Sequence, residues 1–535
     1  MFLNKSMPLI DHVVVAIMEN RSFDNLLGWL YSDVDNCPPH TIPPEAGFQY
    51  DGLVANTYAN TLTGDEASRV YVKRSTSAWP PHHEPLLVPM PDPGESFAHI
   101  TRQIFGTDDP PPDAHANMSG FLRDYATVAD SGAVGQIMET YSPDQAPILN
   151  GLARNFAVCD RWFASAPCQT WPNRGFVHCG SSAGHINNDD YVPYDIPTIF
   201  NVLYDQGISW GVFSDTIYTP ALTGIQFSRL WSFTEQFKSF AEFQQRCRVS
   251  ADAAAEEKLP AYSFIEPRFL LEWTLGKTHY ANDYHCSHNI AFGEAFLAKL
   301  YGAVQQSPYR DRILLIISFD EHGGCYDHVP PPCHATPPEP GALSNEGDFH
   351  FDRFGVRVPA IVVSSYVEPG TVFRAEEGEA PYDHTSILAT LRDWKELDQD
   401  PAHPFLPSSR IAAAPTLARV LTRSEANHEW PTLTHSHRVK TDKGILKRPL
   451  NDLETSLLVG EENRRRGDQP VDHASIDYIR NTVKTHQHLV SYRLQRDAPQ
   501  RNLIAKVAEF WLQLRLNVVA PIVQWCADRI DTLRH

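Results

Sequence analysis

Short, uninterrupted runs of apolar and β-branched residues recur along the chain, and segments with a helical spacing of apolar residues separate them. The apolar runs lie at 13–18, 208–213, 262–265, 313–319 and 358–363, and the helical patterns lie at 197–206 and 290–306. Apolar runs without polar alternation predict strands that are buried on both faces of a sheet. Because strands and helices alternate, the sequence predicts an α/β fold with a mostly parallel central sheet.

Acidic and amide side chains follow directly after several of these predicted strands. They are Glu19, Asn20, Glu266, Asp320 and Glu321. In a parallel sheet the carboxyl ends of the strands meet at one edge, and ligands bind at that edge. Clustered carboxylates repel one another unless a cation lies among them, so the pattern predicts a metal site there. The alternative interpretation is a set of ordinary polar loop residues.

Two segments contain a candidate hydroxyl nucleophile. Thr170 is followed by Asn173 and Arg174, which are suited to hold an anionic substrate, and a hydroxyl beside a dication is activated without a dedicated histidine base. The alternative is the segment Gly180–Gly184, G-S-S-A-G, which matches the G-x-S-x-G pattern of serine hydrolases. A serine-hydrolase site does not need carboxylates at several strand ends. This short pattern would leave those carboxylates without a role, so it is the weaker candidate.

Composition and charge narrow the class of protein. The chain has 535 residues, 42% of them hydrophobic, and a formal net charge of −20. These values are typical of a folded protein with a large core, and the negative charge excludes nucleic acid as the main partner. Nine cysteines without a CxxC pair predict free thiols. Because no signal-peptide pattern is seen, we expect a cytoplasmic or peripheral membrane protein.

The composition also suggests how the chain is divided. We expect residues 1–440 to form a catalytic domain in which residues 35–125, rich in Pro and Gly, are a loop-rich insertion over the active site. Residues 441–535 are more basic and are expected to form a mostly helical extension. Apolar residues recur at helical spacing in 503–530. This helix is expected to bind a membrane surface through its Trp and Phe residues, to pack on the catalytic domain, or to form a homo-oligomer contact.

Several motifs occur in the same order as in a known family. They are H-V-V-V-A-I-M-E-N-R-S-F-D-N at 12–25, M-S-G-F at 118–121, T-W-P-N-R at 170–174, I-E-P at 265–267, N-D-Y-H at 282–285, S-F-D-E-H-G-G-C-Y-D-H-V-P-P-P at 318–332 and D-H-T-S at 383–386. With these motifs the chain resembles the bacterial phosphoesterases that comprise phosphatidylcholine-preferring phospholipases C and acid phosphatase A, within the alkaline phosphatase superfamily. The resemblance implies a three-layer α/β/α sandwich with metal at the carboxyl edge of the sheet.

The resemblance also implies a role for each matching residue. Thr170 is implied as a nucleophile that passes through a phospho-enzyme, and His285 and His322 as residues that contact phosphate or supply the acid for the leaving alkoxide. The implied metal ligands are Glu19, Asn20, Asp320 and Glu321, with His384 added by analogy to the superfamily. Zinc is the expected metal and calcium is the alternative. Asp327 and His328 are expected to shape the loop or to form a layer around the ligands.

Two positions bear on the substrate. Glu95 stands where relatives carry His, and it is a candidate for substrate binding. Phospholipase C members of the family carry Thr at the nucleophile position, as this chain does at Thr170, whereas acid phosphatase members carry Ser. We therefore expect hydrolysis of phosphatidylcholine-like glycerophospholipids to diacylglycerol and a phosphorylated headgroup. A broad-specificity acid phosphatase is the alternative, and a non-catalytic protein on the membrane surface is disfavoured by the near-complete motif set.

Overall fold

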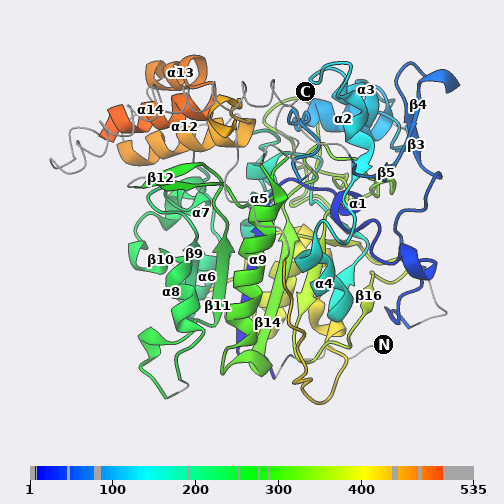
Figure 1. The fold of residues 1–535 in the computed structure, drawn as a ribbon. Helices are drawn as coiled ribbons and strands as arrows, with labels where there is room; N and C mark the ends of the chain where they lie inside the picture. Colours follow the sequence, from blue (N-terminus) through cyan, green and yellow to red (C-terminus); the bar gives the residue numbers. More distant parts are fainter. Residues whose placement is uncertain are drawn as a thin grey trace, which may run out of the picture.

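The fold is built on a central sheet of nine strands, seen here in a computed structural model (Figure 1). The structure describes residues 7–497 except 8, 45–48, 77–85, 112, 189–192, 251, 275–276, 287, 436–443 and 468–472. Across the sheet the strands are β10 (Phe237–Ser239), β9 (Trp210–Ser214), β11 (Tyr262–Glu266), β1 (His12–Met18), β14 (Ile313–Phe319), β15 (Ala360–Val363), β7 (Ala157–Cys159), β16 (Thr371–Phe373) and β2 (His40–Ile42). β15 runs antiparallel to its neighbours β14 and β7, and the other pairings are parallel. The predicted, mostly parallel sheet is confirmed.

Helices cover both faces of this sheet. On one face Phe200 of α6 (Ile199–Asp205) packs against Trp210 and Phe264, and on the other face Phe243 of α8 (Phe240–Arg246) packs against Phe213. The α6 layer also contains α5 (Thr170–Cys179) and α10 (Thr385–Lys395), and the α8 layer contains α4 (Pro147–Asn155) and α9 (Ile290–Gln305). The fold is therefore the predicted three-layer α/β/α sandwich.

The strand and helix boundaries follow the apolar pattern closely. β14 spans the predicted residues, and the two predicted helices occur as α6 and α9. α1 (Phe23–Leu27) begins after Ser22, whose hydroxyl accepts the N–H of Asn25 as a cap. β15 begins only at Ala360, because the preceding Pro359 has no N–H to donate to a ladder.

The segment 35–125 contains more regular structure than its composition predicts. It supplies β2 to one edge of the central sheet. It also forms the hairpin of β3 (Ala59–Thr61) with β4 (Arg69–Tyr71), the short strand β5 (Lys73–Arg74), α2 (Phe97–Phe105) and α3 (Phe121–Tyr125). Ile100 of α2 and Phe121 of α3 belong to a small separate core. Further short elements are β6 (Glu139–Thr140), β8 (Trp162–Phe163), α7 (Leu222–Gln226), β12 (Glu272–Thr274), β13 (Lys277–His279), β17 (Tyr382–Asp383) and α11 (Ser409–Ala413).

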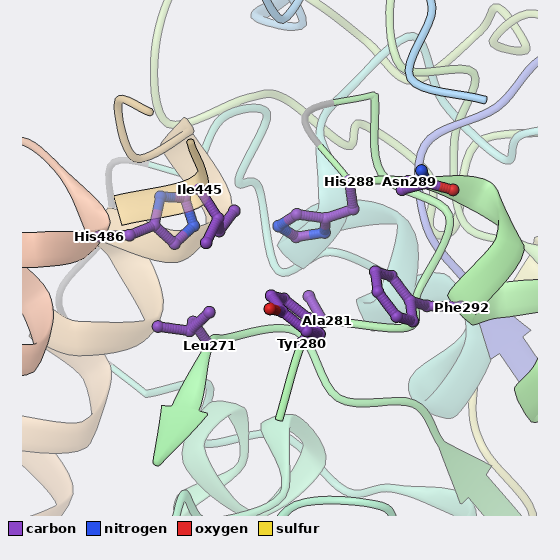
Figure 2. A pocket seen from close by; sticks show the side chains of 8 residues that line it. All are labelled: Leu271, Tyr280, Ala281, His288, Asn289, Phe292, Ile445 and His486. Atoms are coloured by element: carbon purple, nitrogen blue, oxygen red, sulfur yellow. The ribbon is translucent and has the colours of Figure 1, made fainter. Parts of the chain in front are cut away.

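The C-terminal part of the described chain is helical, as predicted. It forms α12 (Asp452–Arg466), α13 (His473–Thr482) and α14 (His486–Asp497), which lie at the same end of the sheet as α2 and α3 (Figure 1). α12 packs on α7, and the indole N–H of Trp171 donates to Ser456 Oγ over 2.8 Å. His288 and His486 face each other across a cavity between these helices and the residues before α9 (Figure 2). The helix expected at 503–530 lies outside the described residues, and none of the described helices is long and apolar enough to cross a bilayer.

Candidate active site

Two neighbouring central strands deliver the first group of site residues. β1 and β14 pair in register up to Met18 and Phe319, so Glu19 and Asp320 come next to each other at the carboxyl edge. The N–H of Asp320 continues the ladder to the carbonyl of Met18 over 3.1 Å. Gly323 has a positive φ of 63° and passes close to Asn20. A Cβ added to Gly323 would lie 2.1 Å from the backbone carbonyl oxygen of Asn20. Glycine is therefore required in the loop that brings the two strand ends together.

Thr170 is the first residue of α5, and its side chain points at the strand ends. The hydroxyl is buried and donates to Glu19 Oε2 over 3.0 Å, with Asn20 Oδ1 at 3.4 Å. Asn173 supports the turn that precedes the helix, because its amide donates to the carbonyls of Ala166 and Cys168. The hydroxyl is thus held beside the carboxylates by local helix geometry.

Arg174 lies beneath the carboxylates. Its guanidinium is fully buried and donates to Glu19 Oε1 at 2.6 Å, with Asp320 Oδ2 at 3.6 Å from Nε. A further bond from Nη2 reaches the carbonyl of Ile17 over 3.0 Å. Its Nη1 has no hydrogen-bond partner among the described residues. Arg174 thus orients the carboxylates and retains one N–H group for an anion.

The charges at the strand ends do not balance without a cation. Glu19, Asp320 and Glu321 are fully buried, and among the described residues Arg174 is the guanidinium that pairs with Glu19 and Asp320. Burial, and then the charge of Asp320, raise the pKa values of Glu19 and Glu321 well above their usual range. Within the described chain, Asp320 Oδ2 and Glu321 Oε1 accept no hydrogen bond. Buried oxygens without partners beside an excess of negative charge fit a divalent metal.

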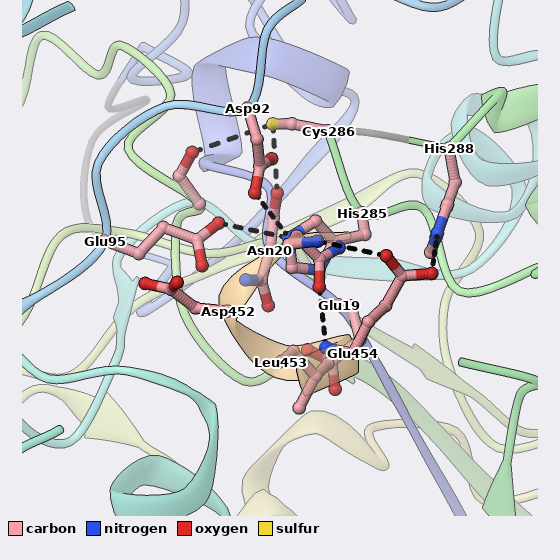
Figure 3. A network of polar contacts seen from close by, with 12 residues as sticks. Glu19, Asn20, Asp92, Glu95, His285, Cys286, His288, Asp452, Leu453 and Glu454 are labelled. Carbon is pink, nitrogen blue, oxygen red and sulfur yellow. Dashed lines mark hydrogen bonds and ion pairs between the residues drawn. The ribbon is translucent and has the colours of Figure 1, made fainter. Parts of the chain in front are cut away.

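A second group of residues surrounds His285 (Figure 3). His285 Nε2 lies 3.2 Å from Asp92 Oδ2 and 3.3 Å from Glu95 Oε1. Burial opposes the charged imidazole, but the two carboxylates outweigh it and raise the pKa of His285 well above its usual range. His285 Nδ1 and Glu95 Oε2 have no hydrogen-bond partner in the described chain. This group therefore presents a protonated imidazole with one free N–H.

The two remaining predicted histidines lie behind the strand ends. His322 Nε2 donates to Gln103 Oε1 over 2.8 Å, and burial lowers its pKa to about 3, so the ring is neutral. His384 Nε2 donates to the carbonyl of Asp320 over 2.6 Å, and its Nδ1 accepts the indole N–H of Trp162 over 3.3 Å. Both nitrogens of His384 are therefore engaged, and its predicted role as a metal ligand finds no free donor atom in this arrangement.

Asp327 and His328 belong to a separate ion cluster centred on Arg357. Arg357 donates to Asp327 Oδ1 over 2.9 Å and to Asp24 Oδ1 over 3.0 Å, and His328 Nδ1 lies 2.7 Å from Asp24 Oδ2. The guanidinium and both Asp carboxylates have no exposed surface. The cluster joins α1 to the loop after β14, so these residues shape the loop.

Removing the central charge of this cluster should destabilise the fold. Arg357→Met leaves Asp327 without its guanidinium and Asp24 with the imidazole of His328 alone, and we expect the free energy of unfolding to fall by about 3–5 kcal/mol. The matched control is Arg229→Met, because Arg229 pairs with Asp195 on the surface, and its loss should change stability by less than about 1 kcal/mol. Urea denaturation of both variants measures the difference, and equal shifts would contradict a structural role for the cluster.

Two other sequence features have different contacts from those of the candidate site residues. The carboxylate of Glu266 accepts the N–H groups of Leu222 and Thr223, each over 2.8 Å, so it caps α7 and is not part of the metal site. Gly180 ends α5 in a left-handed conformation, and Ser181 and Ser182 follow the helix. A nucleophile elbow instead lies between a strand and a helix, so the serine-hydrolase alternative is wrong.

The segment around Glu95, which the sequence placed over the site, also supplies Asp92, whereas sequence reasoning missed Gln103 and Glu454. Asp92 and Gln103 come from the segment before and within α2 and hold His285 and His322. In the sequence, the proximity of Asp92 and Gln103 to Glu95 is the signal that could have identified these two residues. Figure 3 also shows Glu454 of α12 approaching from the C-terminal helices, where it contacts His288. The sequence signal that could have drawn attention to His288 is its position three residues after His285.

A buried hydroxyl bonded to a strand-end carboxylate, with a buried arginine on the same carboxylate, fits a hydrolase site on an α/β/α fold. The chain belongs to the phosphoesterase family, whose model matches residues 10–398. This confirms the predicted family and enzyme class.

Known relatives cover most of the chain. It is 32% identical to non-specific phospholipase C4 of Arabidopsis thaliana over 84% of this chain and 79% of the relative. It is 25% identical to phospholipase C A of Mycobacterium tuberculosis, with 72% of each chain covered. Among solved structures, a protein in the alkaline phosphatase superfamily from Vibrio parahaemolyticus aligns at 10% identity and a TM-score of 0.29, over 61% of this chain and 83% of that chain.

Proposed function

We propose that this phosphoesterase is a phospholipase C that cleaves glycerophospholipids to diacylglycerol and a phosphorylated headgroup. The observation that carries the proposal is the bond of 3.0 Å from the Thr170 hydroxyl to Glu19 Oε2 at the carboxyl edge of the sheet. Relatives named phospholipase C align over most of the chain and support the substrate class. Phosphatidylcholine-like lipids are the proposed substrates.

The proposed reaction begins with attack of Thr170 Oγ1 on phosphorus. Glu19 holds the hydroxyl proton, and the amino end of α5, where Thr170 is the first residue, favours the anionic phosphoryl group. The free Nη1 of Arg174 is suited to bind a phosphoryl oxygen. Diacylglycerol leaves as its alkoxide takes a proton, and water then releases the headgroup phosphate from Thr170.

His285 is the proposed acid for the leaving alkoxide. Its pKa is raised by Asp92 and Glu95, so the imidazole carries a proton at neutral pH, and its Nδ1 has no partner in the part of the chain that is described. Glu95 contacts His285 and acts on the substrate through it or directly. His322 is neutral and bonded to Gln103, so we assign it no proton transfer.

Glu19, Asn20, Asp320 and Glu321 would hold the divalent metal. When bound, it lowers the pKa of the nucleophile and stabilises charge on the phosphoryl oxygens. With both nitrogens of His384 engaged, these side chains offer carboxylate and amide oxygens, the donor set that hard cations such as calcium prefer. Zinc, the metal expected from the family, would rely on fewer nitrogen ligands than it usually has.

Product analysis tests the proposed bond cleavage. With phosphatidylcholine in mixed micelles we expect equal amounts of diacylglycerol and phosphocholine, because the attacked phosphorus keeps its headgroup ester. Mass spectrometry of both phases measures them, with the Thr170→Ala protein as the blank. If the protein releases inorganic phosphate from monoesters and no phosphocholine from the lipid, the acid-phosphatase alternative holds instead.

The residues beyond those described are proposed to bind the membrane surface. Deleting 500–535 removes the Trp- and Phe-containing apolar pattern, so we expect activity on phospholipid vesicles to fall about tenfold or more while hydrolysis of a soluble chromogenic diester changes little. Parallel assays of the two substrates measure the ratio. Equal losses on both substrates would assign this segment to packing or to an oligomer contact.

A further inference from the structure

Three side chains from different elements meet outside the catalytic residues. His288 lies just before α9, Glu454 lies in the first turn of α12, and His486 is the first residue of α14. Nε2 of His288 lies 3.3 Å and Nε2 of His486 lies 2.8 Å from the same atom, Glu454 Oε1. All three side chains are buried, and their potential ligand atoms lie within 4.8 Å of one another.

The other polar atom of each side chain is fixed by a partner of its own. His288 Nδ1 bonds to Asp283 Oδ1 over 2.6 Å, and His486 Nδ1 bonds to the carbonyl of Arg448 over 3.1 Å. Glu454 Oε2 accepts the N–H of Asn451 over 3.0 Å. Metal-binding histidines usually donate their second ring N–H to a carboxylate or a carbonyl, which fixes the tautomer and the direction of the lone pair.

These bonds determine what the two Nε2 atoms present to Glu454. A carbonyl and a carboxylate accept hydrogen bonds only, so Nδ1 of each ring carries the proton. A neutral ring then directs the Nε2 lone pair at an acceptor oxygen, which is repulsive. A dication among the three atoms removes the repulsion. The alternative is a proton on Nε2: burial opposes it, but Asp283 and Glu454 raise the pKa of His288 to about 9.

We propose that His288, Glu454 and His486 bind a zinc ion that joins α12 and α14 to the rest of the described chain. A small cavity of about 10 Å³ lies beside the two imidazoles and is otherwise lined mainly by apolar side chains (Figure 2). Two imidazole nitrogens and a carboxylate oxygen are a ligand set of zinc, with a fourth position for water. Calcium does not take imidazole ligands, so the set discriminates against it.

This site is coupled to the catalytic residues through one short segment. Asp283, which orients His288, also accepts the N–H of Glu19 on its backbone carbonyl over 2.8 Å. His285 of the same segment contacts Asp92 and Glu95 (Figure 3). An ion that fixes His288 therefore also fixes the backbone between the catalytic imidazole and the end of β1. The C-terminal helices thereby support the active site without contributing a catalytic residue.

Zinc content of the full-length protein tests the proposal. Wild type, His486→Asn and His488→Asn are loaded with zinc, dialysed into metal-free buffer and analysed by mass spectrometry. We expect His486→Asn to retain about one zinc ion per chain less than wild type. His488 is an exposed residue of the same helix, so His488→Asn should retain the wild-type amount. All three proteins keep the candidate catalytic residues, and the anomalous peak described next distinguishes an ion at His486 from one at the strand ends.

Two measurements keep the test independent of whether the variant folds. Crystals of the zinc-loaded wild-type protein should show an anomalous peak at the zinc edge about 2.0–2.1 Å from both Nε2 atoms. A chelator should also lower the Tm of wild type and of His488→Asn more than the Tm of His486→Asn, because only the first two would lose this ion. Equal zinc contents in wild type and His486→Asn, or no anomalous peak between the rings, would overturn the proposal.

Discussion

Thr170→Ala should reduce kcat for phosphatidylcholine by at least about 10⁴-fold, because it removes the proposed nucleophile and leaves water to attack without covalent catalysis. The hydroxyl donates to Glu19 and lies near Asn20, and the side chain is buried at the first position of α5. The residue takes little part in holding the helix, because Gln169 is the N-cap. The expected loss is therefore catalytic, and a titration of released phosphocholine over hours measures it.

Thr390→Ala is the matched control for Thr170→Ala. Thr390 is also a buried threonine on a helix that covers the sheet, and its hydroxyl donates to the carbonyl of Ser386 over 2.6 Å. Its removal should lower stability by about 1–3 kcal/mol without changing kcat by more than a few fold. Thr170→Ser keeps a hydroxyl and should retain measurable turnover. If Thr170→Ala were as active as Thr390→Ala, the proposed covalent mechanism would be wrong.

The fold could be predicted because its core strands are buried on both faces. Such strands must be apolar throughout, so β1 and β14 are visible as continuous runs, and their shared orientation places Glu19 and Asp320 at one edge. The same reasoning also selected Glu266, which caps α7. Position at a strand end predicts where a carboxylate lies, but whether it faces a ligand or a backbone N–H depends on the loop packed above it.

Residues that act from other layers could not be predicted from local sequence. Gln103 reaches His322 across 219 positions of the chain, and Glu454 reaches His288 across 166. His384 lies in a matching motif, yet Trp162 and the carbonyl of Asp320 take both of its nitrogens. A motif specifies a residue type, whereas the partners of each ring nitrogen are set by tertiary packing.

Asp320→Asn should remove most of the bound catalytic metal and lower kcat/KM by more than about 100-fold, beyond the loss typical for residues that only support a ligand. The substitution preserves shape but removes a negative charge, and Asn keeps an oxygen that can accept the N–H of Glu321, as Asp320 Oδ1 does over 2.8 Å. Glu19 remains the main partner of Arg174, over 2.6 Å. With less negative charge at the edge, a dication is held less tightly, so activity should return in part at high metal concentration.

Glu266→Gln is the control that separates metal binding from the position of a carboxylate. It removes a buried strand-end charge in the same sheet, but this carboxylate binds the N–H groups at the start of α7. A glutamine can keep one such bond, so we expect a stability loss of about 1–2 kcal/mol and an unchanged metal content. Metal analysis and kcat/KM of both variants, measured with increasing calcium and zinc, distinguish the two roles. Equal metal contents in Asp320→Asn and wild type would exclude Asp320 as a ligand, whereas metal-dependent rescue of Asp320→Asn alone would identify both the site and the ion it prefers.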